Sequence, residues 1–206
     1  MSDAVSPGGD VFSKHRVEAL VDAVFAVVMT LLVLEIKPEL EPHANDEAVR
    51  HTLRALALPL TAYAFAFLIS CVFWNLHHRK FHLLRHTNTR HTALTLVFLF
   101  AITLLPISIS LFLHAKNSGL AKTVYFGNFT IIALTLLISW LYARQAGLAE
   151  TDTKTAAAVN LTTRMYALVT LGVISMVASY FNWPYLLLLV VPVFIYVRRL
   201  RKAATP

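Results

Sequence analysis

The stretch Val17–Ile36 reads VEALVDAVFAVVMTLLVLEI, 20 residues with three acids and no Lys, Arg, Pro or Gly. An α-helix of that length rises about 30 Å, the thickness of the hydrocarbon core of a bilayer. We therefore predict a membrane-spanning helix here. Five more apolar runs follow, at Ala55–Leu76, Thr92–Leu113, Thr123–Tyr142, Met165–Phe181 and Pro184–Val197. The predicted fold is an all-α integral membrane protein with six transmembrane helices.

Composition supports this fold class. Hydrophobic residues make up 57% of the 206 residues and charged residues only 14%, against about 25% charged residues in ordinary soluble domains. The net charge is +7, but the basic residues lie between the apolar runs and not along one polar face. That placement is typical of membrane orientation and argues against a nucleic-acid partner. The lipid bilayer is therefore the expected environment.

The distribution of Lys and Arg predicts the orientation. With both termini inside, the inner segments hold 13 of these residues and the outer segments hold 5. This positive-inside bias places both termini in the cytoplasm. We expect a disordered cytoplasmic N-terminus over residues 1–13, a six-span transmembrane domain over 14–202, and a C-terminal tail over 203–206. The connection Arg144–Arg164 is expected to be polar, with room for an interfacial helix.

The first span carries the most informative side chains. Small residues form a stripe of Ala19, Ala23, Ala26 and Thr30, which favours close approach of another helix. Val27, Thr30 and Leu34 lie on an overlapping face, within about 60° of arc. Two interpretations remain open for this face, because such a stripe also serves plain helix packing and these side chains also suit contact with lipid.

Asp22 lies inside the apolar run, where an unpaired acid is costly. It is predicted to face a neighbouring helix and find a hydrogen-bond donor, in preference to binding an ion directly. Candidate donors are Arg16 and the end of the second span, Trp74, Asn75 and His77. Together these residues form a predicted structural polar network.

The remaining motifs concern metal binding, the membrane surface and catalysis. His78, His82 and His86 have the i, i+4, i+8 spacing of a metal site, but no Cys, Asp or Glu joins them in sequence, and no metal site is predicted. The basic residues around them are expected to face anionic headgroups. Pro106 should kink the third span. No catalytic motif is present, so neither an enzyme nor a cofactor is expected.

Three blocks resemble one known family. They are R-x5-D-A-V-F-A-x3-T-L-L-V-L-E over Arg16–Glu35, F-W-x2-H-H-x2-F over Phe73–Phe81, and F-L-x5-L-P over Phe98–Pro106. Together they resemble the bacterial branch of the transmembrane protein 175 family of potassium channels. The chain departs from the family's Phe-Ser-Asp signature, because it reads Leu20-Val21-Asp22.

The resemblance implies a homotetramer of six-span subunits in the bacterial plasma (inner) membrane, with first helices around a central pore. It implies passive, modestly selective conduction of potassium ions, with Val27, Thr30 and Leu34 at the constriction. The sequence agrees in lacking a TVGYG-like run that would build a carbonyl filter. The alternatives are a proton or other monovalent-cation pathway, or a secondary transporter, on the same scaffold.

Overall fold

The computed structural model describes residues 13–38, 42–43, 45–115, 117–150 and 156–181. Over these residues the regular structure is helical. The elements are α1 (Lys14–Leu31), the short 3₁₀ helix η1 (Leu32–Glu35), α2 (Asp46–His82), α3 (Thr89–Thr103), α4 (Leu105–His114), α5 (Gly119–Gln145) and α6 (Ala156–Tyr180).

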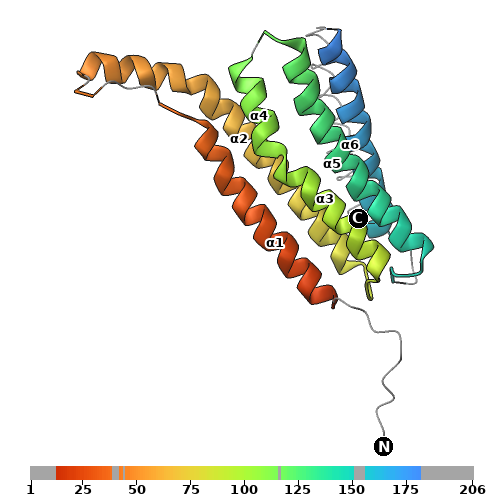
Figure 1. Cartoon of the computed structure of the whole chain (residues 1–206). Helices are drawn as coiled ribbons and strands as arrows, with labels where there is room; N and C mark the ends of the chain where they lie inside the picture. Colours follow the sequence, from red (N-terminus) through yellow and green to blue (C-terminus); the bar gives the residue numbers. More distant parts are fainter. Residues whose placement is uncertain (1–12, 39–41, 44, 116, 151–155, 182–206) are drawn as a thin grey trace, which may run out of the picture.

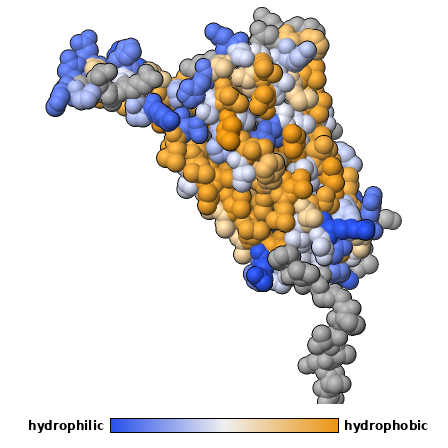
Figure 2. Space-filling model, in the orientation of Figure 1, coloured by the Kyte–Doolittle hydropathy of each residue, from blue (hydrophilic) through white to orange (hydrophobic). Residues whose placement is uncertain are grey.

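Five stretches are long and apolar enough to cross a membrane. They are α1 with η1, α2, α3 with α4, α5, and α6. Figure 1 shows them as a tilted bundle, with α5 and α6 side by side and the N-terminal part of α2 reaching away from the rest. Hydrophobic side chains cover the middle of the molecule in Figure 2, and hydrophilic ones gather at the outstretched end of α2 and at the opposite end of the bundle. These observations confirm an all-helical, multi-pass membrane protein. The sixth predicted span, Pro184–Val197, lies outside the described residues.

The third span is broken at the predicted proline. α3 ends at Thr103, Leu104 adopts φ −83° and ψ −6°, and α4 begins at Leu105 with Pro106 in its first turn. Proline has no N–H to donate, and its ring clashes with the carbonyl of the residue four positions earlier. Two helices therefore replace one straight span.

Two helices extend further than the apolar pattern predicts. α2 starts at Asp46 because Asn45 caps it, its side-chain oxygen accepting the Ala48 N–H at 2.9 Å, and Asp46 and Glu47 occupy the first turn. Such a cap and such acids stabilise a helix N-terminus. α6 starts at Ala156, so the last nine residues of the predicted connection Arg144–Arg164, which was expected to have room for an interfacial helix, form the first turns of α6. Hydropathy marks the part of a helix that suits lipid, and polar turns can extend it at either end.

α1 packs on the bundle through one face. Val17, Val21, Phe25, Val28 and Leu32 are buried, and the Phe25 ring lies 5.9 Å from the Phe98 ring of α3. These positions recur at the helical period, as expected for a helix with one buried stripe. The opposite face of α1, which includes Ala19, Ala23, Ala26 and Thr30, is exposed within the single chain.

At the end opposite the outstretched part of α2, two connections pair with each other. Arg85 N–H donates to the Leu148 carbonyl and Glu150 N–H donates to the Leu83 carbonyl, each at 2.9 Å. The Lys14 ammonium donates to the Leu84 carbonyl at 2.6 Å. Main-chain hydrogen bonds therefore join the connections that follow α2 and α5, and the Lys14 side chain ties the start of α1 to them.

Candidate pore-lining face and its polar network

The predicted constriction residues lie on the open face of α1. Val27 is 55% exposed and Leu34 63% exposed, and Thr30 is also exposed. Ala19, Ala23 and Ala26 of the small stripe are exposed as well. The described part of one chain leaves this face uncovered.

The Thr30 hydroxyl has a defined orientation. It donates to the Val27 carbonyl of its own helix at 2.8 Å. Since its proton is used in this bond, the lone pairs of the oxygen remain available on the open side of α1. A hydroxyl oxygen held in this way is suited to accept from water or to contact a cation.

The helical geometry changes before Leu34. The last turn, Leu32–Glu35, is a 3₁₀ helix and not a continuation of α1. Because a 3₁₀ helix turns further per residue than an α-helix, the arc calculated for a continuous α-helix does not hold for Leu34. Leu34 nevertheless remains on the exposed side of the segment.

Asp22 finds its donor on α2. The Trp74 indole N–H donates to Asp22 Oδ1 at 2.8 Å. One turn earlier on α1, Glu18 Oε1 lies 3.4 Å from His78 Nδ1. Trp74 stacks on His78 with ring centroids 5.7 Å apart, and the Nε2 atoms of His78 and His82 are 3.2 Å apart. Two acids on α1 thus face a row of rings on α2.

The other predicted partners of Asp22 lie elsewhere. Asn75 Oδ1 accepts from Arg79 Nε at 2.8 Å. His77 is buried and stacks on the rings of Phe81 and Phe98, with centroids 4.5 and 5.4 Å away. Arg16 is exposed, and its side chain makes no hydrogen bond within the described residues. The structure therefore brings Asp22 together with Trp74 and not with the other three.

Val21 stands where the family signature has a serine. It is 1% exposed and belongs to the buried stripe of α1, whereas Leu20 is 44% exposed. An apolar side chain at this buried position packs against the bundle and needs no hydrogen-bond partner. At this position the present chain therefore contributes packing to the buried stripe of α1.

A buried cation at the end of α2 was missed by the sequence analysis. Lys80 is 0% exposed. Its ammonium donates to Ser139 Oγ of α5 at 2.6 Å and lies 5.1 Å from the centre of the Phe81 ring. The expectation that the basic residues here face headgroups is wrong for Lys80 and His77. A signal existed, because Lys80 follows buried Phe73 by seven positions and so lies on the same helical face.

The histidine spacing does not produce a metal site. α2 ends at His82, so His86 leaves the helical register that would align it with His78 and His82. Across the described ranges no group of three His, Cys, Asp or Glu side chains is placed to hold a metal ion.

A family model described as "Endosomal/lysosomal potassium channel TMEM175" matches residues 16–106. That range contains α1 with its open face, the Asp22–Trp74 contact and the break at Pro106. Over these residues, somewhat under half of its length, the chain is similar to the TMEM175 family. The matched family is one of channels, and this similarity agrees with the prediction that the chain is not an enzyme.

Two bacterial relatives that match by sequence are named potassium channels. A potassium channel of Chamaesiphon minutus is 31% identical over 64% of this chain and 66% of its own length. A potassium channel of a Chryseobacterium species is 32% identical over 47% of each chain. These matches therefore span less than two thirds of either relative.

A solved structure supports the fold over nearly the whole chain. The crystal structure of a lysosomal potassium-selective channel TMEM175 homolog from Chamaesiphon minutus has a TM-score of 0.74 to this chain at 24% identity. It covers 94% of this chain and 98% of its own. At this identity the likeness establishes the TMEM175 fold.

Proposed function

We propose that the chain is a passive, modestly potassium-selective cation channel whose pore is lined by α1. The observation that carries this proposal is the family match over residues 16–106, a range that contains an exposed α1 face of Val27, Thr30 and Leu34. Two of the relatives matched by sequence are named potassium channels. A face that combines apolar side chains with a threonine hydroxyl has the chemistry of a narrow, partly dehydrating constriction.

The proposed assembly is a homotetramer of six-span subunits with four α1 helices around the axis. Burial supports assembly, because only 28% of the apolar window of α1 with η1 and 17% of that of α2 are buried within the chain, against 50% for the window of α5. A face from one chain also cannot enclose a pore by itself. The small side chains of Ala19, Ala23 and Ala26 allow close approach between neighbouring α1 helices.

The proposed constriction has two apolar rings, Val27 and Leu34, with the Thr30 hydroxyl ring between them. Apolar rings hinder water and so raise the barrier for an ion that keeps its hydration shell. Potassium releases water more readily than sodium, so the rings favour potassium without strictly excluding sodium. The Thr30 oxygen, its proton donated to the Val27 carbonyl, offers lone pairs that partly replace lost water.

The test is the alanine series Val27→Ala, Thr30→Ala and Leu34→Ala, measured as single-channel conductance and as reversal potential with potassium on one side and sodium on the other. Thr30→Ala should lower the potassium-to-sodium permeability ratio, by about fivefold at most if the hydroxyl contributes about 1 kcal/mol. Leu34→Ala should raise conductance. Val97→Ala, at a 52% exposed position on α3, is the matched control. If all three α1 variants behave like Val97→Ala, this face does not line the pore.

We further propose that the Asp22–Trp74 contact holds α1 at the angle that the pore requires. Asp22→Ala and Trp74→Phe each remove the same hydrogen bond, so each should lower the stability of the assembled protein by about 1 kcal/mol. Asp22→Asn keeps an oxygen that can accept the Trp74 N–H, so it should lose less stability than Asp22→Ala. The measurement is the assembled fraction in mild detergent together with channel activity.

A double variant separates this contact from other roles of the two residues. If both residues act through their shared hydrogen bond, the double variant Asp22→Ala with Trp74→Phe should lose little more stability than either single variant. Fully additive losses would contradict the proposal. Asn75 and His77 are not proposed as partners of Asp22, because Asn75 accepts from Arg79 and His77 stacks on Phe81. Arg16 is exposed and is not proposed as a partner either.

The proposed location is the bacterial plasma membrane, with both termini in the cytoplasm and the connection between η1 and α2 outside. Leaving out buried Lys80, the inner segments still hold 12 Lys and Arg residues against 5 outside. Asn45→Cys in a Cys71→Ser background should react with a membrane-impermeant maleimide added from outside to intact cells. Labelling that requires access from the cytoplasm would reverse the topology.

A further inference from the structure

Between the C-terminal end of α2 and the first turns of α6 lies a hollow of about 330 Å³. It is separate from the open face of α1, and its size falls at the lower end of the range for small-molecule sites. Its walls come from the end of α2 and the start of α6, which are far apart in sequence. The lining residues are Arg79, His82, Leu83, Ala157, Asn160, Leu161 and Arg164.

The polar lining is suited to an anion. Arg79 and Arg164 contribute positive charge, His82 and Asn160 add ring nitrogens and an amide, and none of the described lining residues is acidic. Arg79 is held in place because its Nε donates to Asn75 Oδ1 at 2.8 Å. That bond leaves its two Nη groups without a hydrogen bond to any described residue. A guanidinium with free Nη groups is a strong donor for phosphate oxygens.

The hollow lies where the apolar parts of both helices end. On α2 the apolar run stops at Leu76 and the hollow begins at Arg79; on α6 the hollow ends at Arg164 and the apolar run begins at Met165. Figure 2 shows hydrophilic side chains at the end of the bundle opposite the outstretched part of α2, next to the hydrophobic middle of the molecule. The aliphatic side chains of Leu83 and Leu161 lie beside the cationic groups.

We infer that this hollow binds the phosphate headgroup of an anionic phospholipid from the leaflet on the α2 C-terminal side. Charge complementarity selects an anion, and the position at the belt edge selects one that is attached to acyl chains. Basic pockets between transmembrane helices bind lipid headgroups by the same physics. The inference does not depend on ion conduction and adds a ligand site to the proposed channel.

The experiment uses the full-length protein in a neutral detergent. The probes are short-chain phosphatidylglycerol, short-chain phosphatidylcholine and inorganic phosphate, and the readouts are lipid adducts by native mass spectrometry and the thermal unfolding midpoint. Wild type should bind phosphatidylglycerol and unfold at a higher temperature with it, and should respond weakly to phosphatidylcholine. Arg79→Gln and Arg164→Gln should each weaken phosphatidylglycerol binding about fivefold.

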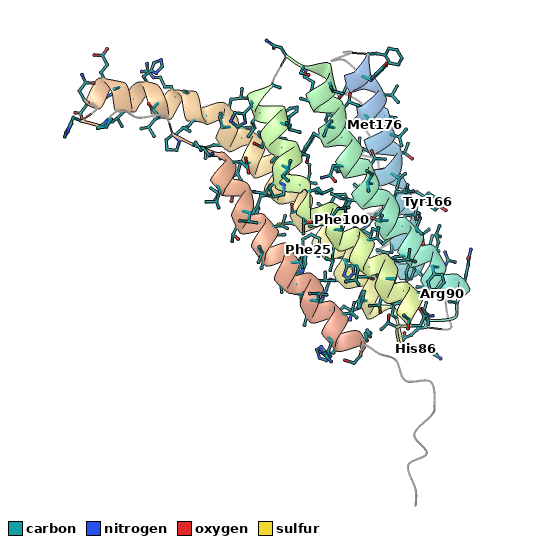
Figure 3. All side chains as sticks on the ribbon, in the orientation of Figure 1. Phe25, His86, Arg90, Phe100, Tyr166 and Met176 are labelled. Carbon is teal, nitrogen blue, oxygen red and sulfur yellow. The ribbon has the colours of Figure 1, made fainter. Side chains whose placement is uncertain are left out.

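Two controls keep the result interpretable. Arg90→Gln removes an exposed arginine at the same end of the bundle that does not line the hollow, and it should bind like wild type (Figure 3). The double variant Arg79→Lys with Arg164→Lys keeps the charge and should bind better than the double glutamine variant. It also reports on the site if a glutamine variant fails to fold.

Three results would overturn the inference. If Arg90→Gln weakens binding as much as the lining variants do, the attraction is a general surface charge. If inorganic phosphate protects as well as phosphatidylglycerol and competes with it, the ligand is a free anion. If phosphatidylcholine binds equally well and the variants change nothing, the hollow does not select charge.

Discussion

Replacing Gly172 with alanine should destabilise the protein more than any surface substitution, because α5 and α6 meet closely at this residue. A Cβ at Gly172 would lie 2.5 Å from Thr130 Oγ1, 2.9 Å from Phe129 Cδ1 and 3.1 Å from Thr130 Cα. The Thr130 hydroxyl is also bonded to the Phe126 carbonyl at 2.7 Å, which restrains its movement. Relief of the clash therefore requires the two helices to separate.

Overpacking of this kind costs about 1–3 kcal/mol. The measurement is the thermal unfolding midpoint of detergent-solubilised protein, followed by fluorescence-detected size exclusion. We expect Gly172→Ala to lower the midpoint by several degrees and to reduce the yield of folded protein.

Gly127→Ala is the matched control for Gly172→Ala. It adds the same methyl group on the same helix pair, but there the new Cβ would meet the flexible Met176 Sδ at 3.7 Å, an ordinary contact (Figure 3). Alanine is also a better helix former than glycine by about 0.5–1 kcal/mol. Gly127→Ala should therefore be neutral or stabilising. If Gly172→Ala is as stable as Gly127→Ala, α5 and α6 do not pack as closely as described.

The features that follow from local chemistry were predictable from sequence. The apolar runs located the helices, Pro106 located the break in the third span, and the cost of an unpaired acid in an apolar run indicated a donor for Asp22. Each of these depends on a property that one residue or one short run carries alone. The sequence could name Trp74 as one candidate for that donor because aromatic residues anchor the ends of spans.

The features that depend on which helices meet were not predictable. The sequence left four candidate donors for Asp22. The way in which α1 crosses α2 places the Trp74 N–H within hydrogen-bond distance of Asp22. Asn75, the next residue, instead accepts a hydrogen bond from Arg79. His77 and Lys80 look like headgroup-facing residues in a basic run, but their helical face is the buried one. The 3₁₀ turn at Leu32–Glu35 likewise has no marker in the apolar run that precedes it.

Removing the Ser139 hydroxyl should be as damaging as the change at Gly172, because it leaves a buried ammonium without its acceptor. Lys80 and Ser139 are both 0% exposed. Lys80 Nζ donates to Ser139 Oγ at 2.6 Å, and Ser139 Oγ in turn donates to the Leu136 carbonyl at 3.4 Å. A buried charged donor that loses its partner costs about 2–3 kcal/mol. Ser139→Ala should therefore lower the unfolding midpoint clearly.

Ser70→Ala controls for the loss of a buried serine as such. Ser70 is also 0% exposed, but its hydroxyl donates to the Ala66 carbonyl of its own helix at 2.9 Å and serves no charged group. Ser70→Ala should therefore lower the free energy of unfolding by much less than Ser139→Ala does. Equal losses for the two serine variants would mean that the bond to Lys80 contributes little.

The decisive variant is Lys80→Met, which keeps the length of the side chain and removes the donor. Replacing a buried charge with an apolar side chain of similar volume is often neutral or stabilising. In the Lys80→Met background, Ser139→Ala should then hardly change the free energy of unfolding. The double-variant cycle should therefore give a coupling free energy of about 2 kcal/mol between the two residues. An undiminished cost of Ser139→Ala in that background would show that Ser139 acts through its packing and not through the ammonium of Lys80.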